Sequence, residues 1–218
     1  MPRYNGVSMI PQQIWSHPDG IIATDACLSG CGGYCRTLGY FFHCEFPHSI
    51  QNKNFDINTV ELLTIMVALK LWGNQLKGHR IKIFCDNQTS VTVINSGRTH
   101  NSILSSCLRE IAYLCAVSEI EIMAQHLLSV TNRWADLLSR AGSNIHNIQQ
   151  FLSEIDFHAV QVTVEQSLCQ FTADWSLNVH HSYFRRCVQA TSGRFVRVQA
   201  CSFCTRYIIE STFSMEVI

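Results

Sequence analysis

The spacing of apolar and polar residues divides the first two thirds of the chain into short strand-like runs and longer helical stretches. Runs rich in β-branched, aromatic and cysteine residues predict strands at residues 21–28, 34–38, 39–46, 80–86 and 120–124. Apolar residues three and four positions apart predict helices from residue 58 or 59 to about 73, and at residues 88–96, 102–117 and 131–140. Three strands followed by alternating helices and strands favour an α/β fold in which helices cover a mixed sheet.

Glycines and polar residues mark the expected breaks between these elements. Residues 29–33 contain three glycines and are predicted to form a turn, because glycine tolerates positive φ angles. Residues 47–56 are predicted to form a polar loop. Asn58 or Thr59 is expected to cap the first long helix, and Gly142 to end the last one.

These breaks suggest three segments. Residues 1–19 form an extended lead-in, in which Trp15 is expected to anchor against the domain. Residues 20–142 form one α/β domain. Residues 143–218 form a poorly defined C-terminal extension of unknown role, with helices predicted at residues 145–157 and 182–190.

The composition is typical of a globular protein with one core and a small appendage. The chain has 218 residues, of which 47% are hydrophobic and 15% are charged. It contains neither an apolar run long enough to span a membrane nor the pattern of a signal peptide, so we expect an intracellular protein, in the cytoplasm or nucleus, that is not secreted and does not contact membranes. The 11 cysteines are therefore interpreted as reduced thiols, and the isolated pair Cys201 and Cys204 as incidental.

The charge distribution gives a weak hint of nucleic-acid binding. The formal net charge is zero, and residues 1–142 hold 11 Lys and Arg against 10 Asp and Glu. If a metal neutralised four of these acids, the remainder of the domain would be mildly basic. Such a bias is compatible with a phosphate backbone as a partner but is not diagnostic of one.

Four acidic residues carry the chemistry that the sequence predicts. Asp25 and Asp86 follow apolar strand-like runs, whereas Glu61 and Asp136 lie in helical patterns. Carboxylates are the ligands that Mg²⁺ prefers, and two such ions can serve the attacking and leaving oxygens of a phosphodiester together. We therefore predict a two-magnesium site in which Asp25 is shared, Glu61 and Asp86 hold one ion, and Asp136 holds the other. Any one of these acids alone would equally suit a helix cap or a solvated surface charge.

His126 lies ten residues before Asp136, on a predicted loop that leads into the last helix. A histidine there could turn toward the acids and take part in proton transfer or product release. The alternative is a structural histidine, as is expected for most of the nine others, of which His43, His79, His100 and His146 are assigned to surfaces.

These motifs resemble the ribonuclease H domain of DIRS-type retrotransposon polyproteins. The resemblance covers about residues 15–142 and rests on the following stretches: Thr24-Asp25-Ala-Cys27-Leu-Ser-Gly30, Asn58-Thr-Val-Glu61-Leu-Leu, Asp86-Asn87 through Asn95, Arg109-Glu-Ile, and His126 with Asn132 and Ala135-Asp136-Leu-Leu-Ser-Arg140. The sequence departs from the usual pattern at four positions: Cys27 replaces a common Ser, Cys31 a Trp, and Leu128-Ser129 a Pro-Gly pair.

The resemblance implies a ribonuclease H-like fold with a five-stranded mixed sheet in the order 3-2-1-4-5 and helices on both faces. It implies magnesium- or manganese-dependent cleavage of the RNA strand of an RNA–DNA hybrid by two ions, next to a reverse transcriptase domain encoded upstream. Asp25, Glu61, Asp86 and Asp136 match the metal ligands, and His126 matches a mobile histidine. Asn87 and Asn132 match positions that contact the substrate.

Two rival interpretations remain. The domain could be a catalytically inert or domesticated module that binds nucleic acid or a protein, or it could be a transposase or exonuclease of the same broad fold. The intact set of four acids argues against the first, and His126 with the Asn132 to Asp136 spacing argues against the second. The chain lacks the Tyr-x-Asp-Asp motif of polymerases, and the spacing of His181, Arg185 and Tyr207 does not fit a tyrosine recombinase.

Overall fold

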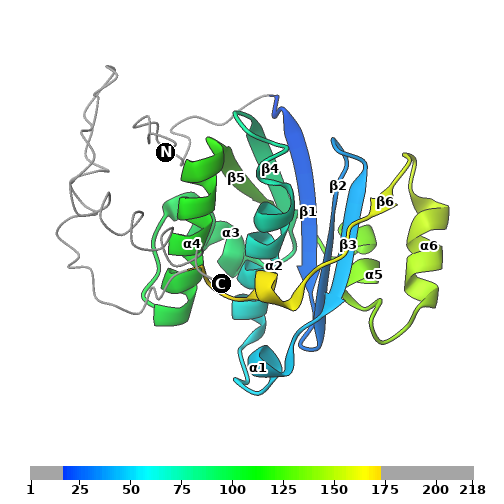
Figure 1. The fold of residues 1–218 in the computed structure, drawn as a ribbon, viewed down its shortest axis with the longest axis horizontal. Coiled ribbons are helices and arrows are strands. Elements are labelled where there is room, and N and C mark those ends of the chain that lie inside the picture. The colour runs from blue at the N-terminus through cyan, green and yellow to red at the C-terminus, as the bar shows by residue number, and fades with distance from the viewer. Residues whose placement is uncertain (1–16, 173–218) are drawn as a thin grey trace, which may run out of the picture.

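A computed structural model describes residues 17–172, which form a mixed sheet between two layers of helices (Figure 1). The six strands are β1 (Gly20–Ala26), β2 (Gly30–Cys35), β3 (Tyr40–Glu45), β4 (Arg80–Cys85), β5 (Glu121–His126) and β6 (Val160–Gln161). Their order across the sheet is β5-β4-β1-β2-β3-β6. Strands β1, β2 and β3 pair antiparallel, whereas β4 pairs parallel with both β1 and β5. The predicted order 3-2-1-4-5 is therefore confirmed for the first five strands, and β6 is an addition.

The helices lie on both faces of the sheet, as predicted. They are α1 (His48–Gln51), α2 (Ile57–Trp72), α3 (Gln88–Ser96), α4 (Ser102–Ser118), α5 (Arg133–Ser139) and α6 (His146–Glu154), followed by the 3-10 turn η1 (Gln166–Cys169). Figure 1 shows α2, α3 and α4 on one side of the sheet and α5 and α6 on the other. No helix within residues 17–172 is long and apolar enough to cross a membrane.

Helix α2 is the centre of the larger core, and most of its side chains are buried, the apolar ones in that core. The residue that caps it differs from the prediction. Asp56, not Asn58 or Thr59, precedes the first turn, and its Oδ1 accepts a hydrogen bond of 2.9 Å from the backbone N–H of Thr59. An acceptor three residues before a free N–H satisfies it, which is why the helix begins earlier in the chain than predicted. The loop predicted at residues 47–56 also contains the single turn α1.

The glycines at residues 29–33 do not form the predicted turn. Gly30, Gly32 and Gly33 lie inside strand β2, and the hairpin turn follows it at residues 36–39, where Gly39 has a φ of +67°. Gly32 is needed instead because helix α5 packs directly on the strand at this position. A Cβ atom at Gly32 would lie 2.5 Å from both the Cβ and the carbonyl carbon of Leu138. The absent side chain therefore sets the distance between α5 and the sheet.

Residues 143–172 continue the packing beyond Gly142. Helix α6, which the sequence predicted at residues 145–157, packs on α5, and the Phe151 ring lies 5.0 Å from that of Phe41. Strand β6 then pairs with β3, and η1 crosses to α2. There the backbone N–H of Thr172 donates to Glu110, a buried carboxylate that also lies 3.0 Å from Lys70 Nζ.

The eight cysteines among residues 17–172 are free thiols, six of them buried. Trp15, the pair Cys201 and Cys204, and the helix predicted at residues 182–190 lie outside the described residues.

Substitution of Gly32 by alanine should destabilise the protein more than the same substitution at a glycine with open space around it. We expect Gly32→Ala to cost about 3 kcal/mol of unfolding free energy, because the clash is with the backbone of α5 rather than with a movable side-chain end. Gly78→Ala is the control: its φ is +78° but no atom lies within 4 Å of the added Cβ, so only about 1 kcal/mol of backbone strain is expected. Equal losses in urea unfolding would contradict this account of strand β2.

Candidate active site

Three acidic residues from three elements meet at one edge of the sheet. Asp25 lies near the end of β1, and Asp86 directly follows β4. Because β1 and β4 are parallel, with Ala23 opposite Phe84, the two aspartates end side by side. Glu61, from the second turn of α2, completes the group, and one carboxylate oxygen of each residue lies within 4.8 Å of the other two. We call Asp25, Glu61 and Asp86 the acidic triad.

Without a cation, burial of the acidic triad in its ionised form destabilises the folded state. Asp25 and Glu61 are only 4% and 2% exposed, and Glu61 Oε2 is buried without any hydrogen-bond partner. Burial raises the pKa of Asp25 to about 7, where the charges of Asp86 and Asp136 add to the effect and a hydrogen bond from Ser139 opposes it. Burial and the neighbouring Asp25 and Asp86 raise the pKa of Glu61 to about 9. A divalent cation would relieve both the desolvation and the mutual repulsion.

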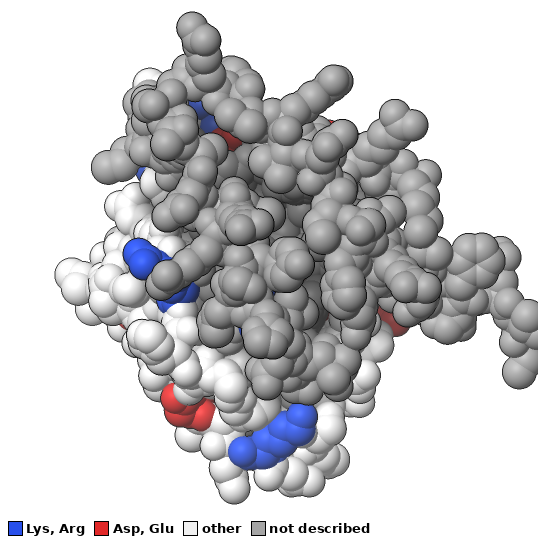
Figure 2. All heavy atoms as spheres, turned by 90° about the vertical axis from the view of Figure 1, so that its left-hand side faces the viewer, with Lys and Arg blue, Asp and Glu red and all other residues white. Residues whose placement is uncertain are grey.

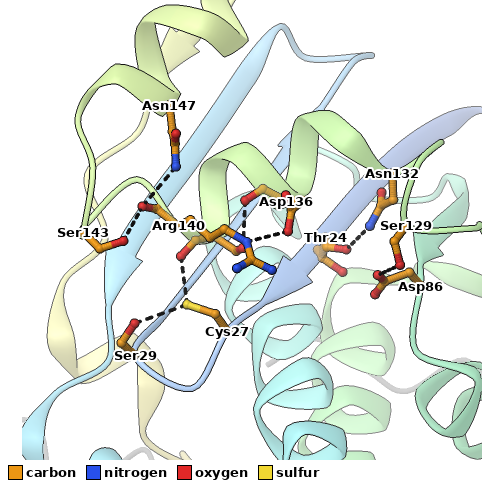
Figure 3. Close-up of polar contacts among 11 residues, drawn as sticks. Thr24, Cys27, Ser29, Asp86, Ser129, Asn132, Asp136, Arg140, Ser143 and Asn147 are labelled. Carbon is orange, nitrogen blue, oxygen red and sulfur yellow. Dashed lines mark hydrogen bonds and ion pairs between the residues drawn. The ribbon is translucent and has the colours of Figure 1, made fainter.

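Asp136, the fourth predicted ligand, lies beside the triad but not within it. It is on helix α5, close enough for its charge to act on Asp25, and its side chain is 38% exposed. Its Oδ1 is 2.7 Å from the Nε of Arg140, four residues further on, which is the C-cap residue of the same helix (Figure 3). The structure thus separates the predicted ligands into a buried group of three and an exposed fourth that is paired with an arginine.

A family described as reverse transcriptase-like matches residues 18–142, more than half of the chain. The chain belongs to this reverse transcriptase-like family. No curated protein matches it closely enough to count as a relative. The matched region contains all five strands of the predicted sheet and all four acids, and its topology is the ribonuclease H-like fold.

His126 occupies a different place from the one predicted for this ribonuclease H-like domain. It is the last residue of β5 rather than part of a loop, because the pairing of β4 with β5 continues to Cys85 opposite His126. Its Nε2 donates a hydrogen bond of 3.0 Å to the backbone carbonyl of Asp86. The ring therefore lies next to the site, attached to the chain segment that carries one of the acids.

Ser129 contacts the acidic triad directly, which the sequence did not reveal. Its hydroxyl donates a hydrogen bond of 2.6 Å to Asp86 Oδ2 (Figure 3). In the sequence Ser129 stood out only as a departure from a Pro-Gly pair. A serine in the loop after β5 gives no signal for such a contact until the pairing of β4 and β5 is known.

Asn87 and Asn132, predicted to contact substrate, both make hydrogen bonds within the domain. Asn87 caps α3 by accepting from the N–H of Ser90 at 2.8 Å, and it donates to Asn58 Oδ1 at 2.9 Å. Asn132 is buried, and its Nδ2 donates to the carbonyl of Thr24 at 3.0 Å (Figure 3). These bonds hold α3 against α2, and the start of α5 against β1. A substrate role for either residue remains a prediction, whereas their role in positioning the acid-bearing elements is visible.

The raised pKa values predict how stability depends on pH when no ion is bound. The folded pKa values of Asp25 and Glu61, about 7 and about 9, exceed the ordinary values of 3.8 and 4.5, so the folded state binds more protons than the unfolded state between these limits. The contribution of these two groups to the free energy of unfolding should therefore be greatest below about pH 4 to 5. It should decrease as the pH rises toward 9. Urea unfolding in the presence of a chelator measures this slope.

The variants Glu61→Gln and Glu154→Gln test whether Glu61 causes this dependence of stability on pH. Glu61→Gln should flatten it, because an amide has no proton to lose on burial. Glu154→Gln should leave the fall in place, because Glu154 is paired with Arg133 on the surface and its pKa is lowered by that contact. Excess Mg²⁺ should also reduce the fall in the native chain. Stability that rises with pH in the chelated native protein would contradict the assignment.

Proposed function

We propose that this chain is a metal-dependent ribonuclease H that hydrolyses the RNA strand of RNA–DNA hybrids, derived from a DIRS-type retroelement and working beside a reverse transcriptase domain encoded upstream. The observation that carries the proposal is the acidic triad: three carboxylates from separate elements lie within 4.8 Å of one another, with Glu61 Oε2 buried and without a partner. Structural packing alone gives no reason to bury like charges together, whereas a divalent cation does.

The donor set fits magnesium or manganese. All of the ligands would be hard carboxylate oxygens, and Asp86 and Asp136 are partly exposed, so water and phosphate oxygens would complete the coordination from their side. Asp25, Glu61 and Asp86 would hold one ion, and Asp25 with Asp136 would hold a second. Ions bound there would supply an activated water and would stabilise the leaving oxygen of the phosphodiester.

The protein's own residues supply position and access. Asp25 and Glu61 are fixed by a central strand and by a helix buried along its length, so their carboxyl groups have little freedom to move. Asp86, held by Ser129, and Asp136 are the partly exposed members and face the side from which a hybrid would approach. His126 is bonded to the Asp86 carbonyl and would exchange a proton at the edge of the site. Recognition of RNA would depend on its 2′-hydroxyl groups.

The acids themselves indicate where the hybrid would approach. Asp25, Glu61 and Asp86 gather at the edge of the sheet where β1 and β4 end. Figure 2 shows a different face, on the α4 side, where the charged side chains that can be seen among the described residues are scattered. We therefore place the hybrid at the edge that carries the acids.

Removing charge from the triad should abolish cleavage. With Mg²⁺, the purified chain should cut the RNA of a labelled hybrid and leave double-stranded DNA intact, and Asp25→Asn or Asp86→Asn should reduce the rate to background, because each removes a metal ligand without changing side-chain size. Asp156→Asn is the matched control: this exposed aspartate pairs with Arg36, away from the triad, and its substitution should leave the rate unchanged. A native chain that binds the hybrid without cutting would favour the inert binding module instead.

Substitution of His126 should slow turnover without ending it. We expect His126→Ala to lower kcat about a hundredfold, at the lower end for loss of a proton-transfer group. His126→Gln can still donate to the Asp86 carbonyl but cannot transfer a proton as an imidazole does. If His126 transfers protons, both variants should be slow; if it only holds Asp86, the glutamine variant should recover native kcat. A complete loss of cutting in both variants would contradict this prediction, because it would make His126 essential.

A further inference from the structure

The four acids of the site are not equally available to a cation. Among residues 17–172, no ion pair with Lys, Arg or His involves Asp25, Glu61 or Asp86. Asp136, in contrast, already has a positive partner in Arg140, at 2.7 Å. The triad is thus ready for an ion, while the position that Asp136 would serve has a guanidinium beside it.

The Arg140 side chain is tied to the site by charge rather than by packing. It is 59% exposed, and its pKa is raised first by the hydrogen bond and charge of Asp136, with a smaller contribution from Asp25. Its backbone is held independently: the carbonyl of Arg140 accepts from Ser143 Oγ at 2.9 Å and from Asn147 Nδ2 at 3.3 Å (Figure 3). The guanidinium can therefore leave Asp136 without disturbing the end of α5.

Exchange of Arg140 for an ion is energetically accessible. An exposed ion pair within one helix stabilises a protein by roughly 0.2–1 kcal/mol, a factor of about 1.4 to 5 in an equilibrium. A released arginine would remain at the rim of the site, where its planar donors suit the phosphate group of a nucleic acid. The same side chain would thus oppose an ion before substrate arrives and favour the substrate afterwards.

We propose that Arg140 is a positioning residue that makes the site load its two ions in sequence. The first ion enters the acidic triad, where no Lys, Arg or His side chain of residues 17–172 forms an ion pair that it would have to displace. The second binds only as Arg140 gives up Asp136, and the freed guanidinium then pairs with a phosphate of the hybrid. This inference rests on the proposed function and adds to it a device that links occupancy of the second ion position to the presence of substrate.

The test is a titration of the substrate-free chain with Mn²⁺, followed by calorimetry, in the native protein, Arg140→Gln and Arg133→Gln. Arg133 is the matched control, because it lies on the same helix, is 52% exposed and also forms an ion pair, but with Glu154 away from the site. We expect Arg140→Gln to bind the first ion as the native chain does and the second about threefold more tightly. Arg140→Lys, which keeps the charge, should return the second affinity toward the native value.

Kinetics on the hybrid provide an independent readout. The KM for hybrid should rise severalfold in Arg140→Gln although its second ion binds more tightly, whereas a merely structural loss would weaken both. An unchanged or weaker second affinity in Arg140→Gln, or the same change in Arg133→Gln, would overturn this inference while leaving the proposed function intact. A native chain that binds no Mn²⁺ and cuts no hybrid would overturn both.

Discussion

The burial of two carboxyl groups beside a third is the constraint on which the rest of this structure depends. Asp25 and Glu61 are almost entirely removed from water, and one oxygen of Glu61 has no partner at all. Ionised acids in such surroundings repel one another and lose their hydration, so the fold must hold them by other means. It does so with the apolar packing of α2 and with the parallel pairing of β1 and β4, which together fix three acids that are far apart in the sequence. The buried acids lower the stability of the fold at this edge, and the same arrangement favours binding of a cation.

The other side of the sheet is arranged around the same edge. Because Gly30 and Gly32 of β2 have no side chain where α5 crosses them, the helix approaches closely there, and this brings Asp136 and Arg140 up to the buried acids. The buried Asn132 fixes the start of the helix to β1 through the carbonyl of Thr24. Helix α6 then covers α5 from outside. The position of one exposed aspartate thus depends on glycines, an amide and a helix that have no chemistry of their own.

Much of this could be predicted from the sequence. Long periodic elements were found nearly at their observed limits, among them α3 and α4, and the order of five strands followed from the family resemblance. The convergence of Asp25, Glu61 and Asp86 was expected: the two aspartates end apolar strand-like runs, and Glu61 lies in the helical pattern between them. What failed was local. Glycines signal both turns and close packing, and only the position of α5 decides between them. Asp56 was not predicted as the cap because it was assigned to the polar loop at residues 47–56, among other residues that can also cap a helix.

The contacts that tune the site were beyond the sequence for a different reason. Ser129 reaches Asp86 across a loop, and the pairing of Arg140 with Asp136 is at a spacing that occurs on any helix surface. Neither pattern is distinctive until the acids have been located in space. Strand β6 was missed because two residues are too few to show an alternation of apolar and polar positions.

That short strand has a consequence for the molecule as a whole. Val160 and Val162 donate backbone hydrogen bonds to the carbonyls of Gly39 and Phe41, so β6 occupies part of the outer side of β3. An unpaired strand at the border of a sheet is a template on which other polypeptides can add and aggregate. Because β6 belongs to the same chain, the domain itself covers part of the edge that could otherwise pair with another molecule. A polypeptide cut at Gly142 would lack β6, and this part of β3 would be exposed.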